Sequence, residues 1–145
     1  MPMQYSQKVI IKNTDYEKVR EAFHSIELVR FLTYLQPINI IEWSGIENGK
    51  TAYFKLWFFG WKDFKVVHEN YQSDNNHLFF VDKGIKLPLG IAFWKHEHRV
   101  FKDKKNTIIE DSLSFNHRNK YIGYLLFPVL VFPIFVRRVL YKIYF

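Results

Sequence analysis

The stretch FWKHEHRVFK, residues 93–102, alternates between charged and mostly uncharged side chains. Alternation with period two is typical of a β-strand that buries one face. One face carries the charged groups Lys95, Glu97 and Arg99. The other face carries Trp94, His96, His98 and Val100, and we expect it to point inward. The sequence therefore predicts two histidines on an otherwise apolar inner face.

The stretch NTIIEDSLSFNH, residues 106–117, predicts a second strand whose inner face has one polar exception. This inner set is Ile109, Asp111, Leu113 and Phe115. If the turn DKKN sets Asp103 opposite Asn106, then His98 lies opposite Asp111. The same register sets His96 opposite Leu113 and Trp94 opposite Phe115. Because directly opposed Cβ atoms lie about 4.5–5.5 Å apart, we expect His98 and Asp111 to be hydrogen-bonded partners.

Further segments extend this hairpin into a larger sheet. Turn signals such as Asn48-Gly49 separate apolar stretches that predict about seven antiparallel strands in all. Residues 13–25 predict a helix directly after the first strand, with a capping box formed by Thr14 and Glu17. A second short helix follows it. This order of elements indicates an α+β fold with one curved antiparallel sheet.

The composition suits one compact domain over residues 1–145. The chain is 48% hydrophobic and 19% aromatic, which is more aromatic than an ordinary core needs and favours a cavity lined with rings. The absence of cysteine excludes disulfides, thiolate metal sites and cysteine nucleophiles. No signal-peptide pattern follows Met1, so we expect a cytoplasmic protein.

The net charge of +7, from 21 Lys and Arg against 14 Asp and Glu, favours contact with anionic partners. The basic residues are scattered and accompany no nucleic-acid-binding motif, so we expect no nucleic-acid partner. Weak contact with an anionic membrane stays open, as does the oligomeric state.

The C-terminal segment, residues 120–145, contains sixteen consecutive residues without a charge, 121–136. A membrane-spanning helix needs about 20 apolar residues, and Pro128 and Pro133 interrupt this run. Two interpretations remain, a long helix buried against the sheet and a segment that rests on a membrane. We favour the buried helix. The prolines leave open whether it is kinked or forms a membrane-contacting gate.

The order of these elements resembles the helix-grip fold of the START-like or SRPBCC superfamily. The resemblance is closest to bacterial ligand-binding SRPBCC proteins and to the polyketide cyclase/dehydrase group. It rests on four stretches in the same order as in those proteins, FFVDKG, FWKHEHRVF, NTIIEDSLSF and IFVRRVLYKIYF. It implies a curved sheet of about seven strands, two short helices after the first strand and a long C-terminal helix across the sheet, enclosing a hydrophobic cavity.

For function, the resemblance implies binding of a hydrophobic or amphipathic small molecule, such as a lipid, a polyketide-like compound or a quinone, for sequestration or transport. No cofactor is implied. One alternative is a cyclase or dehydratase that uses His98 and Asp111 as acid and base. A second alternative is a peripheral membrane protein that binds through the apolar C-terminal segment.

Inward positions on the predicted strands and C-terminal helix are the candidate ligand-binding residues. They are Trp94, His96, His98, Asp111, Leu113, Phe115, Phe54, Leu56, Phe58, Phe64, Val66 and Val129. Ile41, Trp43 and His68 are expected to face the same way. Taken singly, any of these residues could instead be packed core.

The inward polar group allows three interpretations. A metal site would use His96, His98 and Asp111, but nothing in the sequence suggests an outer partner for these ligands, so we predict no metal. A catalytic dyad would move protons through His98 and Asp111. We favour a structural pair in the cavity wall, in which His98 and Asp111 satisfy each other and His96 offers one hydrogen bond to a ligand.

Overall fold

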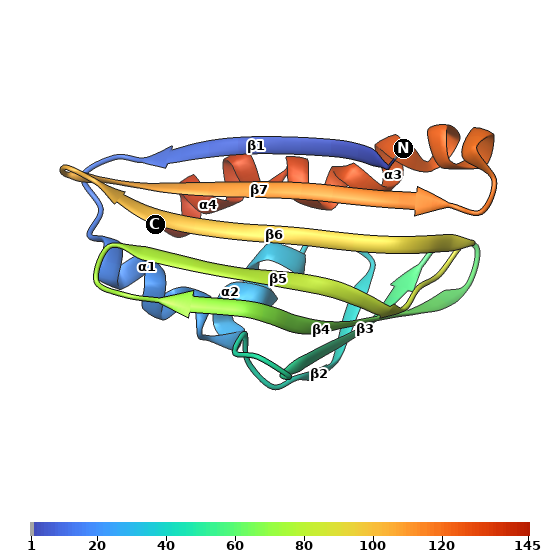
Figure 1. Cartoon of the computed structure of the whole chain (residues 1–145), viewed down its shortest axis with the longest axis horizontal. Helices are drawn as coiled ribbons and strands as arrows, with labels where there is room; N and C mark the ends of the chain where they lie inside the picture. Colours follow the sequence, from blue (N-terminus) through green and yellow to red (C-terminus); the bar gives the residue numbers. More distant parts are fainter. Residues whose placement is uncertain (1) are drawn as a thin grey trace.

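The computed structural model describes residues 2–145, which form one seven-stranded antiparallel sheet and four helices (Figure 1). The strands are β1 (Met3–Ile11), β2 (Ile38–Trp43), β3 (Thr51–Trp57), β4 (Trp61–Ser73), β5 (His77–Lys86), β6 (Ile91–Asp103) and β7 (Asn106–His117). The helices are α1 (Tyr16–Phe23), α2 (Ile26–Thr33), α3 (Lys120–Phe135) and α4 (Arg137–Tyr144). The expected α+β architecture, with about seven strands, is confirmed.

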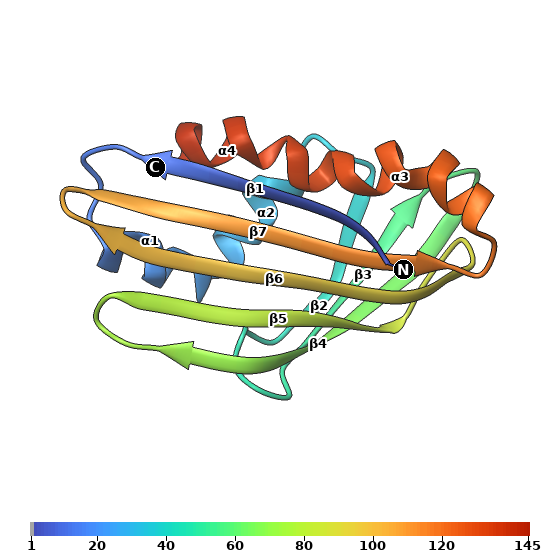
Figure 2. The same ribbon diagram turned by 45° about the horizontal axis from the view of Figure 1, so that its top comes forward.

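The strand order is β1-β7-β6-β5-β4-β3-β2. Successive hairpins join β2 to β7, and β1 pairs with β7, so the first strand lies next to the last. α1 and α2 carry the chain from β1 to β2, which are the two edges of the sheet (Figure 1). α3 and α4 follow each other along the length of the sheet beside β1 (Figure 2). The helices therefore cover the inner face of the sheet.

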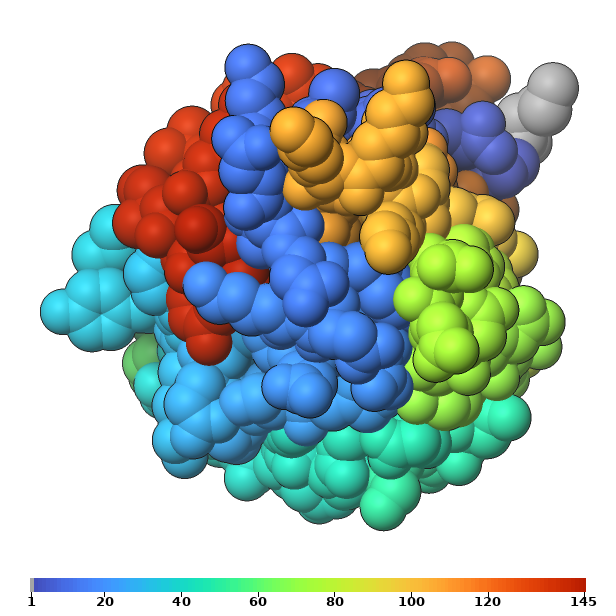
Figure 3. All heavy atoms as spheres, turned by 90° about the vertical axis from the view of Figure 1, so that its left-hand side faces the viewer, coloured from blue at the N-terminus to red at the C-terminus, as the bar shows by residue number. Residues whose placement is uncertain are grey.

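Two clusters of buried side chains pack on this inner face. In one cluster, α1, α2 and α4 contribute Phe23, Leu28 and Tyr141. In the other, α3 contributes Leu126 and Leu130. Figure 3 shows an end of the molecule where the blue helical segment, the red C-terminal segment and the orange β6–β7 hairpin meet without a deep hollow. This end of the molecule therefore shows no opening to the interior.

Helix α1 begins one residue later than the predicted capping box requires. Asp15 is the N-cap, and its carboxylate accepts a hydrogen bond from the backbone N–H of Glu17 at 3.3 Å. Thr14 instead donates its hydroxyl to the carbonyl of Lys12. The predicted capping box is wrong, because a carboxylate at the next position competes with the threonine hydroxyl as N-cap.

The predicted C-terminal helix is divided at Val136 into α3 and α4. Pro128 and Pro133 lie inside α3 and lack the N–H that would bond to the carbonyl four residues earlier. Near the division, the side-chain amide of Gln7 donates to the carbonyl of Ile134 at 2.7 Å. The interruption of the helix is therefore tied to β1 by a hydrogen bond.

The C-terminal helices are only partly buried. One face of α3 packs on the sheet through Gly123, Leu126, Leu130, Val131 and Ile134. Taken together, α3 and α4 (Lys120–Tyr144) are long and apolar enough to cross a membrane. In the fold, 28% of their most apolar 18-residue stretch is buried. The prediction of a buried helix is thus correct for one face of α3 and wrong for the other.

Candidate functional site

A cavity of about 600 Å³ lies between the inner face of the sheet, α2 and α3. Most of its lining side chains are aliphatic or aromatic. The ionisable side chains that reach it from β4, β5, β6 and α4 include His68, Asp82, His96, His98 and Arg137. The cavity therefore combines an apolar interior with one cluster of ionisable groups.

Nine of the twelve predicted ligand-binding residues line this cavity. They are Trp94, His96, His98, Phe54, Leu56, Phe58, Phe64, Val66 and Val129. The other three, Asp111, Leu113 and Phe115, are buried on β7 but do not line the cavity, so their prediction as cavity wall is wrong. The Phe127 ring of α3 stacks on Phe115 at 6.0 Å between centroids, and Asp111 is enclosed by its contacts with His96, Gln7 and Arg137. For the nine, contact with a ligand stays a prediction.

Two further inward predictions are correct, since Trp43 and His68 line the cavity. Ile41 is wrong. A β-bulge between Ile40 and Glu42 shifts the alternation of β2 by one residue, and Ile41 is exposed.

Sequence reasoning missed two members of the site, Asp82 and Arg137. Asp82 follows Leu78 and Phe80 at two-residue spacing on β5, and both of those side chains are buried. A carboxylate in phase with buried apolar residues is the same signal that identifies Asp111 as an inward residue, so Asp82 could have been found. Arg137 carries no such signal, because it follows directly after the apolar run of α3.

The predicted pairing of β6 with β7 is confirmed. His98 lies opposite Asp111, His96 opposite Leu113, and Trp94 opposite Phe115. Both histidines and Asp111 are buried, as expected for the inner face.

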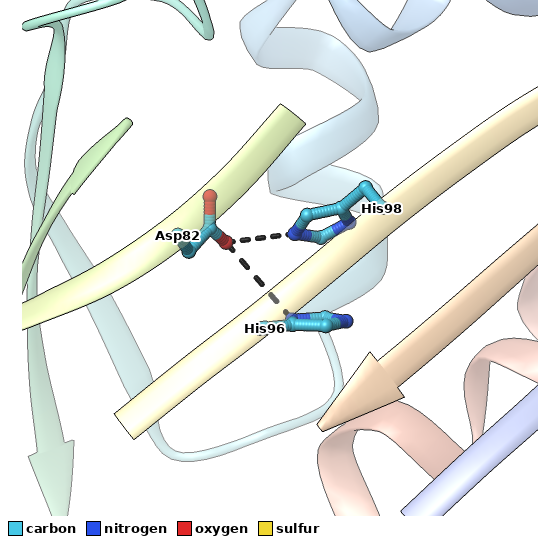
Figure 4. A group of neighbouring side chains, drawn as sticks. All are labelled: Asp82, His96 and His98. Carbon is cyan, nitrogen blue, oxygen red and sulfur yellow. Dashed lines mark hydrogen bonds and ion pairs between the residues drawn. The ribbon is translucent and has the colours of Figure 1, made fainter. Parts of the chain in front are cut away.

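The hydrogen bonds of the histidines run diagonally between strands and not between opposite residues. His96 donates from Nε2 to Asp111 Oδ1 at 2.9 Å. His98 donates from Nε2 to Asp82 Oδ2 at 2.8 Å (Figure 4), although Asp82 lies opposite His96 on β5. His98 Nδ1 lies 3.5 Å from Asp111 Oδ1 and forms no hydrogen bond. His98 and Asp111 are therefore partners at ion-pair distance, but the predicted hydrogen bond between them is wrong, because each imidazole directs its Nε2 to a diagonal neighbour.

His68 and Phe80 hold this group from the side of β4 and β5. His68 Nε2 lies 3.0 Å from Asp82 Oδ1, and its Nδ1 lies 2.7 Å from the carbonyl oxygen of Lys50. The Phe80 ring stacks on His98 at 4.3 Å between centroids, and the His96 and His98 rings are 3.8 Å apart. The imidazoles are therefore fixed by ring packing as well as by hydrogen bonds.

Arg137 joins the group from the first residue of α4. Its Nη1 lies 3.8 Å from Asp111 Oδ1, and it donates a hydrogen bond to the hydroxyl of Tyr141 at 3.4 Å. Gln7 on β1 donates to Asp111 Oδ2, also at 3.4 Å. Asp111, which is 0% exposed, is thus contacted from β1, β6 and α4.

Burial and neighbouring charges set the ionisation of the group. Burial opposes ionisation of both Asp82 and Asp111. Attraction to His98 nevertheless holds the pKa of Asp82 well below its usual value, and a hydrogen bond from His96 does the same for the pKa of Asp111. Burial, together with the charge of His98, lowers the pKa of His96 to about 4. Burial also disfavours a charged His98, yet the attraction of Asp82 outweighs it and raises the pKa of His98. The group therefore favours two carboxylates and a neutral His96, and it stabilises the protonated form of His98 relative to a free imidazole.

Asp82, His96 and His98 place three potential metal-ligand atoms within 4.8 Å of one another. His96 also has an outer partner, Asp111, which sequence reasoning did not find. A divalent cation would nevertheless enter a buried group in which His98 already donates to Asp82 and Arg137 already faces Asp111. The absence of a resident metal stays our prediction, now because of these existing contacts.

A double-mutant cycle tests the diagonal pairing. Asp111→Ala leaves the Nε2–H of His96 buried without an acceptor, and His96→Ala removes the main hydrogen bond to the carboxylate. We expect the two losses in unfolding free energy to be non-additive by about 1–3 kcal/mol, measured by urea unfolding. Lys95→Ala, on the outer face of β6, is the control and should be additive with Asp111→Ala. Additive losses for the His96 pair would show that the pairing is misassigned.

The lowered pKa of His96 predicts a loss of stability in mild acid. An unfolded imidazole takes up a proton near its ordinary pKa, whereas folded His96 resists protonation down to a pKa of about 4. Stability is therefore lost as the pH falls between these values, by roughly 2–3 kcal/mol from pH 7 to pH 4.5. His96→Gln should remove this component, which urea unfolding across that pH range measures. Identical pH profiles for both proteins would contradict the assignment.

Zinc retention tests the absence of a metal. Protein loaded with zinc and then dialysed should retain no stoichiometric zinc by elemental analysis, because a divalent cation would disrupt the existing contacts of this buried group. Stoichiometric retention that His98→Ala abolishes would establish a metal site at Asp82, His96 and His98 instead.

No protein-family model matches the chain, and no curated protein matches it in sequence. Solved structures match it in fold. Norcoclaurine synthase from Thalictrum flavum, in complex with dopamine and hydroxybenzaldehyde, is 13% identical with a TM-score of 0.68, covering 98% of this chain and 85% of that one. Ara h 8.0201 is 13% identical with a TM-score of 0.57, covering 100% of both chains. Major latex-like protein 151 from Panax ginseng is 13% identical with a TM-score of 0.58, covering 96% of this chain and 95% of that one. The chain therefore has the helix-grip fold of the Bet v 1-like, or SRPBCC, proteins, as its sequence predicts.

Proposed function

We propose that this chain binds a hydrophobic or amphipathic small molecule in its cavity, for sequestration or transport. The observation that carries the proposal is a cavity of about 600 Å³ with mostly apolar walls and one cluster of ionisable groups. Cavities of roughly 300–1,000 Å³ that are lined by apolar side chains and a few fixed polar groups are typical of small-molecule sites. The ligand classes that suit such a site are a lipid, a polyketide-like compound or a quinone.

The polar cluster would give such a ligand a defined orientation. Because His96 donates from Nε2 to Asp111, Nδ1 of the neutral ring carries a lone pair. This Nδ1 lies 4.0 Å from Asp82 Oδ2, beyond hydrogen-bonding distance, so it is available to accept from a ligand hydroxyl. The apolar part of the ligand would lie against aromatic walls such as Phe64 and Trp94. Each Å² of apolar surface removed from water there contributes about 25 cal/mol.

The structural neighbours support a small-molecule site in this fold. The norcoclaurine synthase structure contains dopamine and hydroxybenzaldehyde. At 13% identity the likeness establishes the fold alone, so the proposal depends on the cavity of this chain and on its own side chains.

The second candidate is an acid–base enzyme of the cyclase or dehydratase kind. It is favoured by the orientation of His96, since Asp111 fixes this ring beside the cavity as a third group fixes a catalytic base. Two facts weigh against it. Asp111 does not line the cavity, so a His98–Asp111 dyad could not act directly on a substrate. A pKa of about 4 also makes His96 a weak base at neutral pH. We therefore place binding ahead of catalysis.

Filling the cavity should abolish binding. Ala52 is buried and lines the cavity, so the indole of Ala52→Trp would occupy the space that a ligand needs. We expect the dissociation constant of the apolar fluorescent probe 1-anilinonaphthalene-8-sulfonate to rise about tenfold or more. Ala92→Trp, at an exposed position of β6, is the matched control and should bind the probe as the parent protein does.

Fluorescence titration gives the dissociation constants, and circular dichroism verifies that both variants fold. Unchanged affinity in a folded Ala52→Trp protein would rule out the cavity as the binding site. As a separate measurement, native mass spectrometry of protein purified from its own host would assign the ligand class through the mass of a co-purified molecule.

A further inference from the structure

The outer face of α3 is apolar along its whole length. Its exposed side chains are Tyr121, Ile122, Tyr124, Leu125, Pro128, Val129, Phe132 and Phe135. The side chain of Leu125, for example, is 76% exposed. A helix that packs one face on a soluble core normally carries charged or polar residues on the other face, and α3 carries none between Lys120 and Val136. This outer face is therefore unusual for a surface that meets only water.

Two other segments expose apolar side chains beside the same cavity. The β3–β4 hairpin tip, WFFGW at residues 57–61, exposes Trp57, Phe59 and Trp61, of which Phe59 is 82% exposed. The connection between α2 and β2 exposes Tyr34 and Leu35, both about four-fifths exposed.

The cavity links these segments to α3. Leu35, Trp57, Val129 and Phe132 all line it while remaining exposed to solvent. The hairpin tip, the α2–β2 connection and the outer face of α3 therefore lie around the opening of the cavity. We call these exposed residues of the three segments the mouth surface.

The charges at the two ends of α3 have one sign. Residues 112–145 contain no Asp or Glu and five basic residues, Arg118, Lys120, Arg137, Arg138 and Lys142. Two of the five precede or begin α3, and three follow it, of which Arg137 turns inward to Asp111 and leaves Arg138 and Lys142 on the surface. Lys120 lies over the ring of Tyr121 at 5.5 Å, and Arg138 over the ring of Phe135 at 5.4 Å. The apolar outer face of α3 is thus flanked by cations at both ends.

We propose that the mouth surface docks on an anionic lipid bilayer, with the cavity opening toward the membrane. An apolar face between clusters of Lys and Arg matches an interface whose headgroups are negative and whose acyl chains begin just below them. Tryptophan and tyrosine, which the hairpin tip and α3 expose, are the residues that favour this level of a membrane. The docking itself does not depend on the proposed function. The choice of ligand does rest on the proposed function: a cavity that opens toward the bilayer would take up a lipid or another molecule dissolved in the bilayer.

Two other arrangements fit the structure less well. A spanning helix would have to leave the sheet, yet Leu126, Leu130 and Ile134 hold α3 in the core and Gln7 binds the carbonyl of Ile134. A second copy of the chain on the mouth surface would bring two sets of basic residues together without acidic partners from residues 112–145. A bilayer supplies both the apolar layer and the negative charge.

Vesicle co-sedimentation of the full chain tests the docking. We expect weak binding to phosphatidylcholine vesicles, and much stronger binding when about a quarter of the lipid is phosphatidylglycerol. Raising sodium chloride to about 0.5 M should weaken the second interaction, because it screens the basic residues. Leu125→Gln and Phe59→Ser should each lower the partition coefficient about tenfold, since each removes an exposed apolar side chain.

Matched controls separate the mouth surface from the rest of the molecule. Ile10→Gln replaces an exposed apolar residue on the outer face of β1 and should bind vesicles as the parent protein does. Lys120→Glu should reduce the preference for anionic vesicles, whereas Lys104→Glu, in the β6–β7 turn, should reduce it less. In vesicles of brominated lipid, tryptophan emission should be quenched, and Trp61→Phe should reduce the quenched fraction.

The outcomes that overturn the docking differ from those that overturn the cavity as a ligand site. No binding to anionic vesicles, or equal losses for Leu125→Gln and Ile10→Gln, would overturn the docking. A stable dimer that Leu125→Gln dissociates in analytical ultracentrifugation, without any effect of vesicles, would assign the surface to a second copy and overturn it too. Ala52→Trp should still bind vesicles, and Leu125→Gln should still bind the soluble probe. Failure of one proposal therefore leaves the other standing.

Discussion

The buried carboxylate of Asp111 is the constraint on which the remaining structure depends. It is 0% exposed, and a charge in such a place is tolerated only when it is paired and hydrogen-bonded. His96, Gln7 and Arg137 supply those contacts from β6, β1 and α4. One group thus fixes how three elements meet. A slip of one residue between β6 and β7 would turn both cavity histidines outward and leave the carboxylate without its main donor.

The sequence predicts the β6–β7 register because a short turn joins the strands and only one alternation buries the apolar side chains. It does not predict the hydrogen bonds, since an imidazole reaches both opposite and diagonal neighbours. The position of Asp82 opposite His96 depends on β5, and the sequence of the loop 87–90 that joins β5 to β6 does not set the register across it. The inward orientation predicted for Ile41 is wrong for a related reason, because the β-bulge beside it shifts an alternation that appears regular in the sequence.

The composition of the C-terminal segment suits both a helix buried in a core and a helix associated with a membrane, and hydropathy alone cannot separate the two classes. An apolar run measures how much surface avoids water, but not which neighbour covers it. In the fold, every fourth or third residue of α3 packs on the sheet and the intervening ones are exposed. The buried interpretation therefore holds for one face of α3, the membrane-resting interpretation stays a proposal for the exposed face, and the sequence could not separate the two faces without the position of the sheet.

The polar anchors also limit how the cavity could open. Arg137 follows α3 after one residue and contacts Asp111, and Gln7 holds the carbonyl of Ile134. Moving the C-terminal end of α3 away from the sheet would separate Arg137 from the buried carboxylate and break the hydrogen bond from Gln7 to Ile134, which is unfavourable. The hairpin tip and the first turns of α3 carry no comparable anchor within the described residues, and their contacts with the core are apolar. If the proposed docking holds, a ligand from the bilayer would pass between the hairpin tip and Val129 and Phe132 of α3, which line the cavity, while Arg137 and Gln7 keep the end of the helix in place.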